Sequence, residues 1–390
     1  MSILKAYYNR KKKQSVYRET FLSDLLPADF VESTITFQSG IPRQNAEQYI
    51  QPFLNGGNCK IKWDRKVAIS TPLRLQSDTT IIATDITKGA ILATGSEKPI
   101  FMNRNIVFAG NTSIVDKNII IDGGTWHGNN DGQQNKGTPE FGLATINSFH
   151  GVKNLQYRNC NFFEPMTYCI LANNIVDGVY EDIYIDVGVN SRSNKDGVHF
   201  DGWCANCRIS RLDVKTLDDA IGLNTNDAFT KKFNYPDRTF TDFYDVSMYG
   251  PITNIIIEDI HFRNSIFGIR LLSTVALVSN ITIRRFTGIT GEYAILIDNF
   301  QSDMNWCTPN GLGNFKNIII DDIDVIISDR VQWGANQSAV INIAGSIDGL
   351  TATNVLGARN GSKPLYAKKP SCPLGNYIYK NIVVNGQNIT

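Results

Sequence analysis

Several features of common protein classes are scarce in this 390-residue chain. Charged residues make up only 19% of it and the formal net charge is +1, so electrostatics favour neither nucleic acid nor an anionic membrane as a partner. No apolar run in the sequence approaches the roughly 18 residues of a membrane-spanning helix. The N-terminus, from Met1 to Tyr8, lacks the apolar segment of a secretory signal. We therefore expect neither membrane insertion nor export by that route.

Cysteine and histidine are also few. The seven cysteines are an odd and scattered set, which excludes a disulfide framework. Cys204 and Cys207 form a C-x2-C pair, but no second pair follows at zinc-ribbon spacing, and the chain has only four histidines. We therefore expect no metal and no cofactor, and we interpret the cysteines as small buried residues.

What the chain does contain is a recurring phrase of Asn or Asp, β-branched residues, a charged residue and a turn. The phrase begins at Asn118, Asn154, Asp177, Asn206, Asn254, Asn280, Asn317 and Asn381. Its shortest step, 23 residues, fits one coil of a parallel β-helix, and longer steps indicate coils with loop insertions. The interval after Asn317 is long enough for two coils, and the phrase at Asp348 marks the additional one.

This repeat predicts an all-β fold, a single-stranded right-handed parallel β-helix. Alternating Ile and polar residues bury one face of each strand inside the coil. The recurrent Asn fits a turn, because it tolerates left-handed backbone and hydrogen-bonds along a stack of equivalents. A β-propeller is disfavoured, because its blades need four strands each and regular spacing.

The first 54 residues read differently from the rest. Residues 45–55 predict a short helix, weakened by Pro52, which would cover the open end of the solenoid. We therefore divide the chain into an N-terminal segment with a capping helix, 1–54, and a parallel β-helix that carries the active site, 55–390.

Acidic residues mark the predicted site. Asp196 is followed 22 residues later by Asp218 and then Asp219, and equivalent positions on adjacent coils lie about 4.8 Å apart. Because crowded carboxylates repel one another, one of them should hold a proton at neutral pH. A protonated acid beside ionised carboxylates is the arrangement of a glycosidase. The alternative is that these residues cap turns or bind a structural cation.

The surroundings of the aspartates supply candidate substrate-binding residues. These are Lys195, His199, Asp201 and Asn224, together with Arg270 further along the chain. Two segments are candidate groove walls, because aromatic rings stack on sugar faces. They are the insertion of residues 224–244 and the earlier stretch 126–130.

The motif Asn194-Lys-Asp-Gly197, followed by Asp218-Asp219, resembles family 28 glycoside hydrolases, the polygalacturonase-like enzymes. The stretch Gly268-Ile-Arg-Leu-Leu272 looks like the arginine motif of that family. The likeness covers roughly residues 55 to 300 and implies a pectin-lyase-like β-helix. The chain also looks like the β-helical tailspikes of bacteriophages, many of which degrade surface polysaccharides of their hosts.

The resemblance implies roles for the acidic residues. Asp218 would be the general acid, Asp196 and Asp219 would hold and activate the attacking water, with inversion at the anomeric carbon, and Arg270 would contact the sugar. The chain departs from the family where Lys195 replaces Thr and Leu217 replaces Gly. No Gly-His-Gly follows the Asp pair, and Leu272 stands where the family has a lysine that grips a uronate. Homogalacturonan is therefore disfavoured as the substrate unless Lys195 or Lys215 replaces that lysine.

Three functions remain open from the sequence. The first is an inverting hydrolase of a polysaccharide, which includes a phage depolymerase of a bacterial surface glycan. The second is a polysaccharide lyase or epimerase, which abstracts the proton beside a uronate carboxylate. The third is a tail adhesin that binds glycan without cleaving it. The resemblance to tailspikes further implies a homotrimer, located in the virion tail or outside the cell after lysis if the chain comes from a phage, and otherwise in the cytoplasm.

Overall fold

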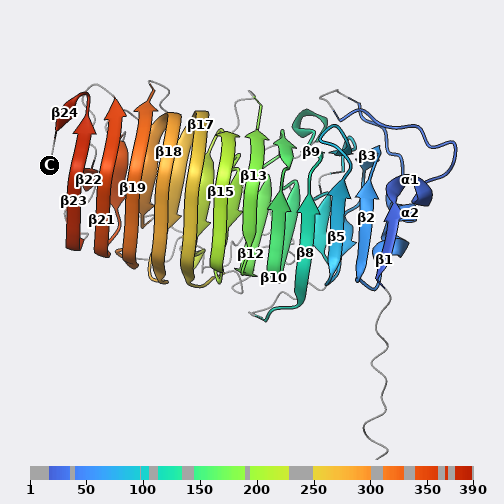
Figure 1. Ribbon diagram of the computed structural model, residues 1–390, viewed down its shortest axis with the longest axis horizontal. Coiled ribbons are helices and arrows are strands. Elements are labelled where there is room, and N and C mark those ends of the chain that lie inside the picture. Colours follow the sequence, from blue (N-terminus) through green and yellow to red (C-terminus); the bar gives the residue numbers. More distant parts are fainter. Residues whose placement is uncertain are drawn as a thin grey trace, which may run out of the picture.

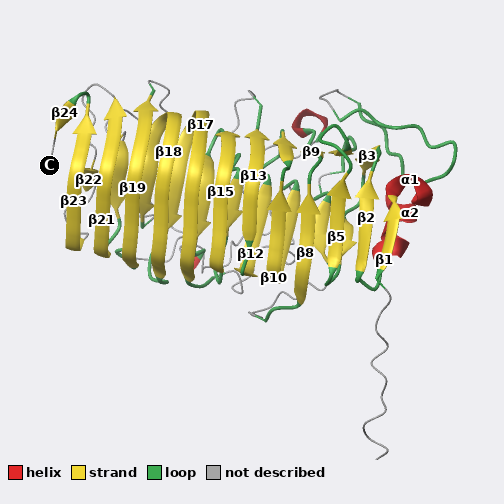
Figure 2. Ribbon diagram, in the orientation of Figure 1, coloured by secondary structure: helices red, strands yellow, loops and turns green. Residues whose placement is uncertain are grey.

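The computed structural model describes residues 17–35, 40–96, 98–104, 113–133, 145–188, 194–227, 249–299, 311–328, 339–358, 365–367 and 374–388. Within them the chain winds into coils stacked along one axis, from the blue N-terminal end to the red C-terminal end (Figure 1). Strands dominate this body (Figure 2), and successive coils pair in parallel. The predicted right-handed parallel β-helix is confirmed, with the handedness that parallel crossover connections adopt.

Three parallel sheets form the walls of the solenoid. The first sheet contains β1 (Arg18–Phe21), β2 (Cys59–Trp63), β5 (Thr79–Ala83), β8 (Asp116–Asp122), β10 (Asn147–Arg158), β13 (Val179–Asp186), β15 (Ala205–Lys215), β17 (Ile252–Leu272), β18 (Val278–Asp298), β19 (Phe315–Ile327), β21 (Ile347–Ala358) and β23 (Leu374–Val384).

The other two sheets share some of these strands, because several long strands bend around a corner of the coil. The second sheet starts with β3 (Lys66–Ile69), β6 (Gly89–Leu92), β9 (Thr125–His127) and β11 (Asn161–Phe163) and continues in the later part of β13. The third sheet contains β4 (Leu73–Leu75), β7 (Phe101–Asn103), the start of β10, β12 (Ile170–Val176), β14 (Val198–Phe200), β16 (Asp219–Asn224), the ends of β17 and β18, β20 (Ala339–Ala344) and β22 (Leu365–Ala367). The short β24 (Gln387–Asn388) pairs antiparallel with β23.

A ladder of side-chain amides runs along one turn of the coils. Asn254 has a φ of 58°, in the left-handed region. Its Nδ2 donates to Oδ1 of Asn206 at 3.0 Å, and its Oδ1 accepts from Nδ2 of Asn280 at 2.9 Å. The predicted role of the recurrent Asn is thereby confirmed. The left-handed positions of this turn in the described chain are Asn58, Asp78, Asn118, Asn154, Asp177, Asn206, Asn254, Asn280, Asn317, Gly349 and Asn376.

The last predicted repeat start was wrong. Asn317 lies level with Gly349, and Gly349 with Asn376, because the flanking residues pair in that register. Asn381 instead stacks on Asn354, to which its Nδ2 donates at 2.9 Å. The additional coil expected near Asp348 is present. Both corners of a coil use left-handed Asn, so the phrase alone did not distinguish them.

The ladder gives a stability test. Asn254→Ala removes both amide bonds and places a Cβ in the left-handed region, so we expect the free energy of unfolding to fall by about 1–3 kcal/mol. Asn254→Gly loses the same bonds but tolerates the positive φ, and should cost less. Urea denaturation of both variants measures the difference. Equal losses would show that backbone strain contributes nothing here.

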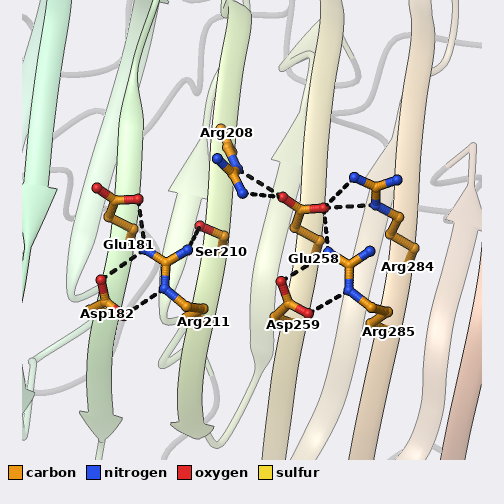
Figure 3. A network of polar contacts seen from close by, with 9 residues as sticks. All are labelled: Glu181, Asp182, Arg208, Ser210, Arg211, Glu258, Asp259, Arg284 and Arg285. Atoms are coloured by element: carbon orange, nitrogen blue, oxygen red, sulfur yellow. Dashed lines mark hydrogen bonds and ion pairs between the residues drawn. The ribbon is translucent and has the colours of Figure 1, made fainter.

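The second left-handed corner carries alternating charges in five successive coils, the last of them at Asp322. Asp182, Arg211, Asp259 and Arg285 have φ values from 56° to 59°. Nε of Arg211 donates to Asp182 at 2.7 Å, and Nε of Arg285 donates to Asp259 at 2.5 Å. Figure 3 shows the two pairs side by side. Opposite charges thus stack where other coils place amides.

Glu258 is the centre of this network. Its side chain is only 2% exposed and accepts from Nε of Arg208 at 2.8 Å, from Nε of Arg284 at 2.7 Å and from Nη2 of Arg285 at 2.6 Å (Figure 3). Burial alone would raise the pKa of Glu258, but the three arginine hydrogen bonds outweigh it and lower the pKa below its ordinary value of 4.5. The carboxylate therefore stabilises the fold above that pH, and the stabilisation is lost as the pH falls through the lowered pKa.

Glu258→Gln should reduce the free energy of unfolding at pH 7 by about 1–3 kcal/mol, a range that allows for solvent screening of the half-exposed arginines. The difference from the wild type should shrink as the pH falls below 4. Denaturant titration at pH 7 and pH 3.5 measures both effects. Glu19→Gln is the control. This exposed acid forms ion pairs with Lys60 and Lys62, and its substitution should change the free energy of unfolding little.

The interior is a continuous apolar column. Ile257, Ile283 and Ile320 lie one above another and are fully buried, and each such side chain contributes about 1.5–3 kcal/mol. The free cysteines at 59, 160, 169, 204 and 207 are also buried, as expected, whereas 307 and 372 lie outside the described residues. None of the helices in the described part of the chain has the length and apolar character to cross a bilayer.

The N-terminal end is covered by α1 (Leu22–Leu25) and α2 (Glu47–Leu54), as Figure 1 shows. Ile50 and Leu54 of α2 are fully buried, and the carboxylate of Glu47 accepts from the backbone N–H of Thr71 at 2.7 Å. The predicted capping helix is therefore present. The sheet already begins at β1, which pairs with β2, so part of the segment assigned to residues 1–54 belongs to the first coil.

Candidate functional site

The three predicted aspartates lie together where strands of the third sheet begin. Asp219 begins β16, Asp218 precedes it, and Asp196 lies just before β14. One carboxylate oxygen of each lies within 4.8 Å of the others. Asp196 and Asp219 are 2% and 4% exposed, whereas Asp218 is partly exposed. The open side of the cluster is therefore at Asp218.

The register differs by one residue from the predicted one. Val198 pairs with Ile221 and Phe200 with Leu223, a step of 23 residues, so Asp219 rather than Asp218 lies level with Asp196. Asp218 sits in the preceding turn, where its carbonyl accepts from Oγ1 of Thr216 at 2.8 Å. Asp218 reaches the cluster from that turn instead of from the strand.

Asp218 is held by backbone donors. Its Oδ2 accepts from the N–H of Asn194 at 2.8 Å, and its Oδ1 from the N–H of Asp219 at 3.1 Å. Desolvation, followed by the charges of Asp196 and Asp219, raises the pKa of Asp218 well above 3.8 against the opposing effect of Arg270. The Asp218 carboxyl therefore favours its protonated form more strongly than an ordinary aspartate does.

Asp219 is tuned by a tyrosine that the sequence did not reveal. Its Oδ1 accepts from the hydroxyl of Tyr293 at 2.8 Å, and the Tyr293 ring stacks on Phe267 with centroids 4.8 Å apart. Desolvation is the largest influence and raises the pKa of Asp219 to about 7, while Arg270 and Tyr293 moderate the rise and Asp196 adds to it. Asp219 pairs with Phe267, which pairs with Tyr293 on the following coil. Identifying this tyrosine from the sequence would have required that strand register.

His199 points into the cluster. Its Nδ1 lies 2.5 Å from Oδ2 of Asp196, and its Nε2 lies 3.3 Å from Oδ1 of Asp201. The ring stacks on Tyr168 at 4.2 Å. Burial would lower the pKa of His199, but its bonds to Asp196 and Asp201 outweigh burial and raise the pKa to about 10. The imidazole is therefore protonated at neutral pH, donates from Nδ1 to Asp196 and forms an ion pair with Asp201 through Nε2.

Arg270 lies in β17, one coil after Gly222. Its Nη2 donates to Oδ2 of Asp298 at 2.6 Å, and its charge lowers the pKa of both Asp218 and Asp219 against the effect of burial. The structure thus brings Arg270 to the carboxylates. Asp298 is a second residue that the sequence analysis missed, because nothing in its local sequence marks it.

Two predicted binding residues are placed less favourably. Lys195 is 1% exposed and its Nζ donates to the carbonyl of Val187 at 3.4 Å. Asn224 is 9% exposed, and its Oδ1 accepts from the N–H of Asn226 at 2.8 Å. Their contacts with substrate stay predictions, and the burial of Lys195 does not favour a role in gripping a uronate. Lys215 is the other candidate for binding a uronate, and its Nζ lies 3.4 Å from Oδ1 of Asp186.

One predicted groove wall was wrong. Trp126 is fully buried and packs edge-on against Trp63 and Phe101 in the core, because β9 turns that side chain inward. His127 beside it is 3% exposed, and desolvation lowers its pKa to about 4. The other predicted wall falls mostly in residues 228–248, which lie outside the described residues.

The three carboxylates have a spacing that would also fit a divalent cation. Two positive side chains already face them, Arg270 and the protonated His199, and the raised pKa values of Asp218 and Asp219 indicate that protons offset the remaining repulsion. The arrangement therefore has the chemistry of an acid–base site. It offers a proton donor and an ionisable acceptor a few ångströms apart.

No protein-family model matches the chain, and no curated protein matches its sequence. Solved structures do match its fold. The family 28 exopolygalacturonase of Yersinia enterocolitica is 12% identical, with a TM-score of 0.50 over 95% of this chain and 79% of that one. The tailspike of E. coli bacteriophage HK620, solved with a pentasaccharide, is 12% identical, with a TM-score of 0.55 over 94% and 67%.

A surface adhesin of Streptococcus pneumoniae, PfbA, is 15% identical, with a TM-score of 0.55 over 89% of this chain and 81% of the adhesin. At these identities the comparisons show a shared fold. The protein is thus a β-helix of a class that includes a glycoside hydrolase, a tailspike and an adhesin.

The raised pKa of Asp219 should lower the free energy of unfolding at neutral and alkaline pH. Between pH 4 and pH 7 folded Asp219 holds a proton that the unfolded chain releases, so stability falls as the pH rises through that range. Asp219→Asn removes this cost, and we expect a gain on the order of 2 kcal/mol at pH 8 that vanishes near pH 3. Thermal unfolding across pH measures it. The exposed Asp324→Asn is the control, and a similar gain there would argue against a strained cluster.

Proposed function

We propose that the protein is a glycoside hydrolase that cleaves a polysaccharide at the Asp196–Asp218–Asp219 cluster. The observation that carries this proposal is a pair of neighbouring carboxyls that both bind protons more readily than usual, since the pKa of Asp218 is raised well above its ordinary value and that of Asp219 to about 7. Glycosidases need such a pair, one carboxyl to donate a proton and one to accept it.

The chemistry assigns one step to each group. Protonated Asp218 donates its proton to the glycosidic oxygen as the bond from that oxygen to the anomeric carbon breaks. A water molecule held by Asp196 and Asp219 forms the new bond to that carbon and gives its proton to one of these two carboxylates. Solvent exchange then returns the proton to Asp218. Asp218 suits the donor role, because it is the partly exposed member of the cluster.

Inversion at the anomeric carbon is expected from the sequence resemblance and not from the spacing. The nearest oxygens lie within 4.8 Å, closer than the roughly 6.5–9.5 Å between the two carboxyl groups of most inverting enzymes. That distance still lets two oxygens share one water, because each needs only about 2.8 Å to it. Proton NMR of the first product anomer distinguishes inversion from retention.

Glycan binding without cleavage is the second candidate, because an adhesin shares the fold at a TM-score of 0.55. Three further predictions follow from the resemblance to tailspikes. The substrate would be a bacterial surface glycan, the protein would form a homotrimer, and it would be located in a virion tail. Analytical ultracentrifugation tests the trimer. A panel of bacterial surface polysaccharides, with products analysed by mass spectrometry, tests the substrate.

Asp218→Asn tests the enzyme directly. The amide cannot donate a carboxyl proton, so we expect release of reducing ends to fall by about 10²–10⁴-fold, while retention of the same glycan on immobilised protein stays unchanged. Asp324→Asn is the control for a distant acidic residue. If the wild type retains glycan but releases no reducing ends, the protein is a binder. A product that absorbs in the near ultraviolet identifies a lyase instead.

A further inference from the structure

His199 occupies a position that the proposed reaction does not yet use. It lies between two carboxylates of its own segment, with Nδ1 2.5 Å from Asp196 and Nε2 3.3 Å from Asp201. Asp196, His199 and Asp201 are 2%, 6% and 0% exposed. Nδ1 is hydrogen-bonded to Asp196, and the positive charge of the ring also forms an ion pair with the buried Asp201. The three side chains therefore form a clamp across β14.

The surrounding coils fix the orientation of the ring. Tyr168 stacks on one face of it with an interplanar angle of 2°. Gly222 lies level with His199 on the next coil, and a Cβ there would lie 2.9 Å from Nδ1 of the ring. The absence of a side chain at Gly222 thus leaves the space in which His199 reaches Asp196. Ring rotation is restricted from both neighbouring coils.

The clamp leaves one oxygen of Asp196 for chemistry. Oδ2 is bonded to His199. Oδ1 is buried and has no hydrogen-bond partner within the described residues. A buried carboxylate oxygen without a partner costs free energy, and a water molecule or substrate hydroxyl between Asp196 and Asp219 would satisfy it.

We propose that His199, anchored by Asp201, is a positioning residue that fixes Oδ2 of Asp196 and directs its Oδ1 at the attacking water. This inference rests on the proposed hydrolase function. The hydrogen bond fixes Oδ2, and the positive charge stabilises the carboxylate that accepts the water's proton. The charged and titratable groups facing His199 are Asp196 and Asp201 from its own segment, Tyr168 before β12, Asp219 from β16 and Arg270 from β17.

The first experiment measures the protonation of His199 in the absence of any substrate. In the protein labelled with ¹⁵N-histidine, the His199 signal, assigned by its loss in His199→Gln, should stay that of an imidazolium up to at least pH 9. Asp201→Asn, which keeps the shape of the side chain but removes its charge, should bring the titration of His199 to a lower pH. His261→Gln is the control, because His261 is exposed and contacts Thr287.

The second experiment reads the effect on catalysis. Both Asp201→Asn and His199→Gln should move the acidic limb of the pH–rate profile to higher pH by about one to three units, because the positive charge beside the carboxylate cluster is weakened or lost. His261→Gln should leave the limb in place. A residue with only a structural role would lower the activity or the melting temperature without moving the limb.

The outcomes separate the two proposals. A His199 signal that titrates near the ordinary value of about 6.5, or a limb that does not move in Asp201→Asn, overturns the positioning role even if glycan is cleaved. A protein that keeps the imidazolium but cleaves no glycan overturns the hydrolase function and with it the catalytic part of this inference, while the clamp stands as a structural element.

Discussion

Backbone hydrogen bonds between successive coils decide which residues of this chain lie above one another. Each coil contributes a strand to the same three sheets, so a side chain has fixed neighbours about 4.8 Å away on the coils before and after it. The stacked amides of Asn206, Asn254 and Asn280 and the stacked isoleucines of the core follow from this constraint. So does the crowding of Asp196 against Asp219, which no local preference of the chain would produce.

The same constraint explains why the site can sustain unfavourable charge. Strands buried on one face and bonded on both edges leave the carboxylates of the third sheet little freedom to move apart. Desolvation and their mutual repulsion raise the pKa of Asp218 and Asp219. The proton uptake that follows, together with the charges of Arg270 and His199, offsets the repulsion. The long apolar column stabilises the fold against this local cost.

The charged residues at the second left-handed corner of the coils differ from those of the aspartate cluster in their partners. There Glu258 is surrounded by three arginines, and its pKa is lowered rather than raised. The contrast between Glu258 and Asp218 shows that burial alone does not set the behaviour of an acid in this fold. The partners that the register places beside it do, because matched charges stabilise the ionised form and like charges disfavour it.

The sequence by itself determined the architecture and the location of the acidic site. The recurring Asn phrase gave the steps of the coils from Asn118 to Asn317, since left-handed turn residues and β-branched strands are local properties. It did not decide the exact level of each strand, so Asp218 was taken for the partner of Asp196 and Asn381 for a member of the wrong ladder. Tyr293 and Asp298 remained hidden for the same reason: they reach the site from later coils. Only the tertiary structure decides such contacts. The register depends on how many residues of each coil lie in the loop between two strands, and the repeated phrase does not indicate that number.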